Sequence, residues 1–119
     1  MQNHEAWLKI AKIDLKAAQE LFLLELFTKV TFETHQTAEK SLKAFLVFHK
    51  QPIIKTHDLI QLIELCLPFD QTLQCLFESA ALLNPYSTRF RYPSEYEIPD
   101  TVDAAKAIAH ATIIHNMVQ

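Results

Sequence analysis

The chain has 119 residues, half of them hydrophobic, which suits a single domain with one apolar core. It contains no glycine, which excludes the glycine-rich loops that bring backbone close to a bound phosphate. Its formal net charge of −3 gives no overall attraction for nucleic acid, so contact with RNA would need a local basic cluster. We therefore expect one domain over residues 1–119.

The first predicted helix runs from about His4 to Leu26. Its apolar stripe repeats at spacings of three and four residues, and consists of Trp7, Ile10, Ala11, Ala18, Leu21 and Phe22. Asp14 and Glu25 fall on the same stripe. Because burying an unpaired carboxylate costs several kcal/mol, we expect at least Asp14 to have a partner.

The second predicted helix runs from about Val30 to His49, and a loop with Pro52 follows it. One side is apolar, with Ala38, Leu42, Phe45 and Leu46. Another side is polar, with Gln36, Glu39, Lys40 and Lys43. Phe32 and Val47 lie near this polar side, so we expect it to be partly covered, by the first helix or by a second subunit.

Acidic caps mark the later helices. Asp58, with Gln61, resembles a capping box for a short third helix to about Leu67, although Thr56 is an alternative cap. Pro68 ends that helix, and Asp70 can cap a fourth. The apolar face of the fourth helix consists of Leu73, Leu76, Phe77, Ala80, Ala81 and Leu83.

Residues 84–99 form the longest irregular segment, with three prolines, three tyrosines and both arginines of the chain. Asp100 can cap a last helix to about Met117. The predicted stripe of this helix consists of Val102, Ala105, Ile108, Ala109 and Ile113. The predicted fold is all-α: an up-and-down bundle of about five helices with a long loop between the last two.

Several site classes have no support in the sequence. Cys66 and Cys75 lack CxxC spacing, and the chain shows no apolar N-terminal signal region, so we expect a cytoplasmic protein with both thiols reduced and buried. No apolar run approaches about 18 residues, so we expect no membrane span. The histidines lack metal-ligand spacing, and we expect neither a metal nor a cofactor.

Three segments stand out, namely the stretch VTFETHQTAEKSLKAFL from Val30 to Leu46, then Thr56-His57-Asp58-Leu59, then Leu83-Asn84-Pro85-Tyr86 with Arg91-Tyr92-Pro93. Together they resemble the HEPN family of small helical nucleotide-associated proteins. Their order and spacing match the family. The resemblance implies a helical homodimer that is either a ribonuclease toxin or the non-catalytic partner of a minimal nucleotidyltransferase.

The ribonucleases of this family carry an arginine followed, after four to six residues, by a histidine. From Arg89 that histidine would stand at residues 94–96, and from Arg91 at residues 96–98, where the chain has Ser, Glu, Tyr, Glu and Ile. Metal-independent RNA cleavage needs a general acid or base beside a cation. The missing motif therefore argues against nuclease activity.

The polar residues that remain predict a binding site for an anion or nucleotide. The candidates are Gln36, Glu39, Lys40, Lys43, His57, Arg89 and Arg91. Lysines one turn apart, a loop arginine and a histidine near a helix N-terminus can hold a phosphate. Spacing alone favours an ordinary surface pair of Glu39 with Lys43, and it fits equally well a His57 that only organises its turn.

Arg91 has a second interpretation, because an arginine in a proline-containing loop can reach a buried acid such as Asp14 on the first helix. An Asp14–Arg91 pair would fix the loop to the bundle and explain the acid on the apolar stripe. Tyr86, Tyr92 and Tyr96 could stack on a base, but aromatic side chains beside prolines more often pack on their own domain.

Two functional hypotheses follow. The first is a non-catalytic homodimer that acts as the nucleotide- or substrate-binding partner of a minimal nucleotidyltransferase, as in a toxin–antitoxin pair. The chain lacks a nucleotidyltransferase motif of its own. The second is a divergent, metal-independent RNA endonuclease that uses His57 with Arg89 or Arg91; RNA is the less favoured ligand.

Overall fold

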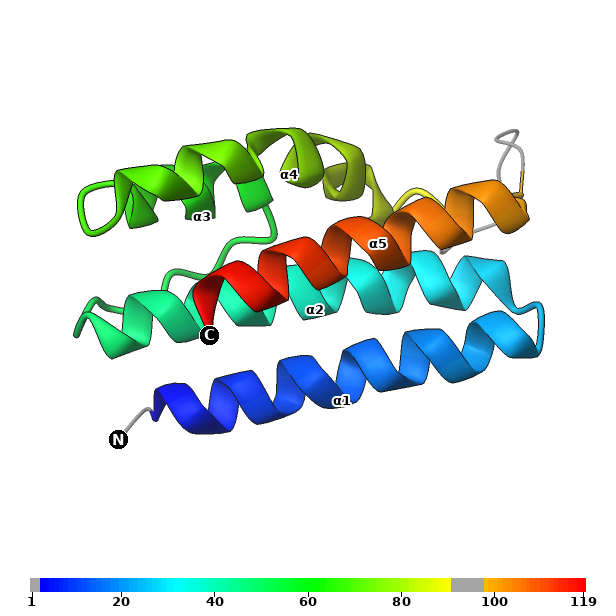
Figure 1. The fold of residues 1–119 in the computed structure, drawn as a ribbon, viewed down its shortest axis with the longest axis horizontal. Helices are drawn as coiled ribbons and strands as arrows, with labels where there is room; N and C mark the ends of the chain where they lie inside the picture. The colour runs from blue at the N-terminus through cyan, green and yellow to red at the C-terminus, as the bar shows by residue number, and fades with distance from the viewer. Residues whose placement is uncertain (1–2, 91–97) are drawn as a thin grey trace.

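The computed structural model describes residues 3–90 and 98–119. In these residues it consists of helices without any strand, which confirms the predicted all-α bundle of about five helices. The elements are α1 (His4–Leu23), α2 (Phe27–Phe48), α3 (Leu59–Cys66), the 3-10 helix η1 (Gln71–Leu76), α4 (Phe77–Leu83), the 3-10 helix η2 (Asn84–Ser87) and α5 (Thr101–Val118). The long helices α1, α2 and α5 lie alongside one another, and α3 and α4 form a second layer (Figure 1).

Side-chain caps begin the helices where the sequence predicts them. The Asp58 side chain accepts hydrogen bonds from the backbone N–H groups of Ile60 and Gln61, and Asp70 caps η1 in the same way. Asp100 and Asp103 form a reciprocal capping box at the start of α5. These bonds satisfy backbone donors that have no partner inside the helix.

The turns after α1 and α2 each place a residue other than glycine at positive φ. Glu25 has φ 58° and Lys50 has φ 61°. In each turn two N–H groups bond back to carbonyls of the last helical turn, as in the Schellman motif that usually has glycine at this position. Because the chain contains no glycine, an ordinary side chain occupies the left-handed position, and α1 ends at Leu23 rather than Leu26.

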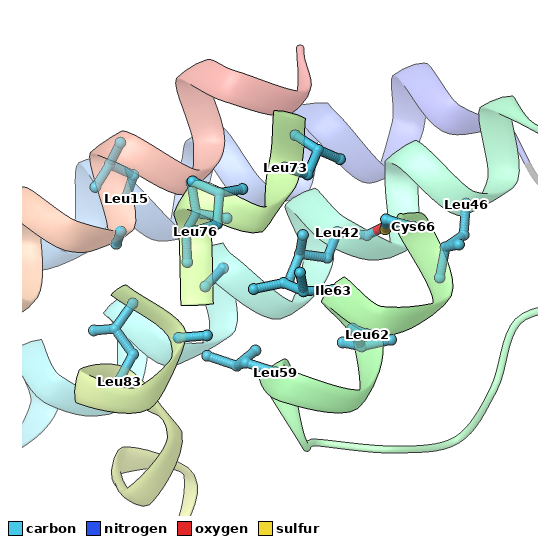
Figure 2. Packing of buried hydrophobic residues seen from close by; sticks show 14 of the residues in the cluster. Leu15, Leu42, Leu46, Leu59, Leu62, Ile63, Cys66, Leu73, Leu76 and Leu83 are labelled. Atoms are coloured by element: carbon cyan, nitrogen blue, oxygen red, sulfur yellow. The ribbon is translucent and has the colours of Figure 1, made fainter. Parts of the chain in front are cut away.

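The main core lies between the two layers, where leucines from α2, α3, η1 and α4 pack together (Figure 2). Cys66 is buried there, and its burial raises the pKa of the thiol to about 12. Cys75 is exposed, so its predicted burial is wrong.

The predicted stripe of α5 is also wrong. Its core-facing residues are Ala104, Ala107, Ala111, Ile114 and His115. Most of the predicted stripe is exposed, namely Val102, Ala105, Ala109 and Ile113. Because α5 carries small or apolar residues on both sides, periodicity could not identify the buried one.

Candidate functional site

A buried carboxylate on α2 is the centre of the polar side of this helix. Glu39 Oε2 accepts a hydrogen bond from Lys43 Nζ at 3.0 Å, and Glu39 Oε1 accepts one from His57 Nδ1 at 2.8 Å. The side chains of Glu39 and Lys43 are only 7% and 9% exposed, whereas that of His57 is 73% exposed. The structure thus joins three predicted site residues, and the Glu39–Lys43 pair is buried rather than on the surface.

His35 completes this group, which we call the Glu39 cluster (His35, Glu39, Lys43 and His57). Its Nε2 lies 2.9 Å from the carbonyl oxygen of His57. A carbonyl only accepts, so Nε2 carries the proton. His35 Nδ1 lies 3.9 Å from Glu39 Oε1 and has no hydrogen-bond partner among the described residues. The predicted site did not include His35, although this residue stands one helical turn before Glu39, a spacing that could have pointed to it.

Burial and hydrogen bonding act in opposite directions on the cluster. Burial by itself would raise the pKa of Glu39, but the hydrogen bonds from His57 and Lys43 outweigh it and lower the pKa. Burial lowers the pKa of His35, and the neighbouring Glu39 carboxylate offsets only part of that effect. The Glu39 carboxylate is therefore ionised near neutral pH, and it compensates the charge of Lys43.

Lys40 lies in a different ion pair. Its Nζ donates to Asp14 Oδ2 at 2.6 Å, so Asp14 has the partner that its position on the α1 stripe required. Glu33 lies close to this pair, and its pKa is raised by burial and by the Asp14 carboxylate. Gln36 stands on α2 between the Glu39 cluster and the Asp14–Lys40 pair, and it is half-buried. The polar side of α2 is therefore partly covered, as expected.

The remaining two candidates lie after η2. Arg89 is exposed, and its guanidinium lies 5.1 Å from the centre of the Phe90 ring. Arg91 lies outside the described residues, so its predicted pair with Asp14 stays a prediction. Of the three tyrosines, Tyr86 is described, and it packs against the main core as the alternative interpretation expected.

Residues on both sides of His57 fix its position. Asn84 Oδ1 accepts from the Leu59 N–H at 2.8 Å, and Asn84 Nδ2 donates to Asp58 Oδ1 at 3.1 Å. Thr56 Oγ1 accepts from the Asp58 N–H and donates to Gln61. The segments around His57 and Asn84 thus meet at the start of α3. The sequence analysis did not assign this structural role to Asn84.

The chemistry open to this arrangement is limited. Among the described residues, no group of histidine, cysteine and acidic side chains is placed to hold a metal ion. None of the described helices is long and apolar enough to cross a membrane. A carboxylate that orients an exposed imidazole can support proton transfer, and it can equally hold a loop in place.

Known structures share this fold over nearly the whole chain. TT1696 from Thermus thermophilus is 26% identical with a TM-score of 0.87, and the match covers 99% of this chain and 97% of that one. ST0689, described as an archaeal HEPN homologue, is 26% identical with a TM-score of 0.80, covering 99% and 96%. A search of curated proteins found no match. The HEPN domain model matches residues 4–119, so this chain belongs to the HEPN domain family.

Proposed function

We propose that this chain is a non-catalytic HEPN subunit that pairs with a minimal nucleotidyltransferase and contributes to binding its nucleotide or substrate. The observation that carries the proposal is the internal pairing of the Glu39 cluster. Lys43 is compensated by Glu39 within a buried pair, and Lys40 is compensated by Asp14. Charged side chains that are paired in this way hold α1, α2 and the start of α3 together, and they are not available to stabilise the charge of a reacting phosphate.

The sequence supports the same proposal. The chain has two arginines, and neither is followed by histidine after four to six residues. The nucleotide site expected at Gln36, Glu39, Lys40, Lys43, His57, Arg89 and Arg91 stays a prediction. A phosphate that binds there has to compete with Asp14 for Lys40 and with Glu39 for Lys43.

Homodimerisation is part of the proposal, and the outer side of α5 supports it. Val102, Ile113 and Met117 are 58%, 46% and 41% exposed on a helix whose other side packs in the core. Together with the exposed Ala105 and Ala109 they form an apolar surface, such as oligomers commonly cover. Light scattering should give twice the chain mass, and Ile113→Glu should give the monomer; a wild-type monomer would contradict the dimer.

Co-purification tests the partnership. A tagged nucleotidyltransferase encoded beside this chain should retain it at a fixed stoichiometry, and the pair should bind ATP or GTP more tightly than the chain alone. If the two proteins elute separately at micromolar concentrations, the partner proposal fails.

One observation favours the alternative, an RNA endonuclease that uses His57. Its imidazole is exposed, and its Nδ1 is oriented by a buried carboxylate at 2.8 Å, an arrangement that suits a general base. If this chain cleaves RNA, its expression alone should arrest growth. His57→Ala should relieve that arrest, whereas the control His110→Ala, on α5, should not. Harmless expression of the wild type would exclude the nuclease.

A further inference from the structure

A surface cavity of about 700 Å³ lies between α1 and the C-terminal end of α5, away from the Glu39 cluster. Its lining includes Lys9, Lys12 and Lys16, which we call the lysine row. None of the described residues that line this cavity is an aspartate or a glutamate. Its size is within the range of small-ligand sites, which is about 300–1,000 Å³.

The lysine row differs from Lys40 and Lys43 of α2, each of which is bonded to a carboxylate. Within residues 3–90 and 98–119, no ion pair holds Lys9, Lys12 or Lys16. The three stand at spacings of three and four residues, so they share one side of α1. Like charges at these spacings repel one another, and a bound anion would relieve that repulsion.

The opposite wall of the cavity supplies neutral hydrogen-bonding groups from α5. His115 is buried, and its Nδ1 lies 2.9 Å from Ser41 Oγ. Ser41 Oγ donates its own proton to the Thr37 carbonyl at 2.7 Å, so it accepts from His115 Nδ1. The His115 ring is thereby fixed with its proton on Nδ1, so Nε2 of the neutral ring is an acceptor and does not donate to a phosphate oxygen. Asn116 and Gln119 also line the cavity, and the Gln119 side-chain amide donates to Asn116 Oδ1 at 3.4 Å.

The charge pattern along α1 limits the length of the ligand. The lysine row spans about 10 Å of helix at a rise of 1.5 Å per residue. Glu5 stands one turn before Lys9, and Glu20 stands one turn after Lys16, so carboxylates flank the row at both ends. An extended polyanion such as RNA would meet these carboxylates, whereas a short anion would not.

We propose that this cavity binds an oligophosphate group of two or three linked phosphates, with the lysine row compensating its charge. The group can come from inorganic tripolyphosphate or from a nucleoside triphosphate, and both carry the same chemistry to the row. This site is separate from the one considered above. It is tested on the chain alone, so its outcome does not depend on a nucleotidyltransferase partner.

The test is isothermal titration calorimetry of the full chain with tripolyphosphate, with ATP and with a short single-stranded RNA. The variant Lys9→Gln/Lys12→Gln/Lys16→Gln removes the row. The matched control, Lys29→Gln/Lys50→Gln/Lys55→Gln, removes three exposed lysines outside the cavity and so changes the net charge equally. Circular dichroism checks that both variants fold, and Lys40→Gln reports separately on the α2 candidate site.

We expect tripolyphosphate to bind, with a Kd raised at least tenfold in the row variant and less than twofold in the control. Tighter binding of ATP than of tripolyphosphate, with the same dependence on the row, would identify a nucleotide as the source. Equal affinities for the two compounds would show that the site recognises the phosphate chain alone. The proposal is overturned if neither compound binds, if the two triple variants behave alike, or if only RNA binds.

Discussion

Lysines on the two neighbouring helices α1 and α2 are placed in opposite electrostatic surroundings. On α2, Lys43 is 9% exposed and bonded to Glu39, and Lys40 is bonded to Asp14. On α1, the lysine row is exposed and lines a cavity that has no aspartate or glutamate among the described residues of its lining. Helical spacing is similar in both places. The spacing of the lysines therefore does not decide their role. A lysine that is bonded to an acid holds the fold together, whereas a lysine without such a bond is available to a ligand.

The largest expected effect comes from breaking the buried pair. Glu39→Gln keeps the shape of the side chain but leaves the Lys43 ammonium buried without a carboxylate. Removing one partner of a buried pair typically destabilises by about 3–5 kcal/mol, and we expect a loss in this range from urea unfolding. The exposed Glu64→Gln on α3 is the control and should stay within about 0.5 kcal/mol. A loss below about 1 kcal/mol for Glu39→Gln would show that the pair is not structural.

A smaller effect is expected for the pair that joins α1 to α2. Asp14 and Lys40 are 14% and 23% exposed, so solvent screens them more than it screens Glu39. A double-mutant cycle with Asp14→Asn and Lys40→Met should give a coupling of about 1–2 kcal/mol. The same cycle with the exposed Glu5→Gln and Lys9→Gln, four residues apart on α1, should give at most about 0.5 kcal/mol. Equal coupling energies in the two cycles would mean that the lysines of α1 and α2 do not differ in how they are paired with acids.

Acid should weaken the fold through the buried histidines. Burial lowers the pKa of His35 and of His115 below the ordinary 6.5, so the unfolded chain takes up protons more readily. The stability that they contribute is present above pH 6.5 and is lost as the pH falls below it. We expect the free energy of unfolding to drop between pH 7.5 and 5.5, and His35→Gln to reduce that drop. An unchanged pH dependence in the variant would assign the effect to other groups.

The smallest effect on stability is expected for the lysine row itself. Lys9→Gln, Lys12→Gln and Lys16→Gln should each change the free energy of unfolding by less than about 0.5 kcal/mol, because exposed lysines without acidic partners contribute little. Urea unfolding of the three variants beside Glu39→Gln measures this. A loss above about 1 kcal/mol in any of them would mean that the row supports the fold rather than a ligand.

Much of the candidate site could be predicted from the sequence, because its residues lie on regular helices. The polar side of α2 predicted that Glu39 and Lys43 would be neighbours, since they are four residues apart. The caps at Asp58, Asp70 and Asp100 were likewise predicted from local hydrogen-bonding rules. The bond from His57 to Glu39 crosses 18 residues, and no local rule assigns it.

The sequence by itself determined the helical class, the capped starts of α3, η1 and α5, and the HEPN resemblance, because periodicity, capping and motif order are local properties of a chain. The start of α2 lacks a side-chain cap and lies at Phe27 rather than at the predicted Val30. Only the tertiary structure decided which side of α5 is buried, that Lys40 pairs with Asp14, and that the lysine row lines a cavity. Each of these depends on which helices pack together. A helix with apolar residues on both sides, or an acid with several lysines in reach, leaves that choice to the packing of the whole domain.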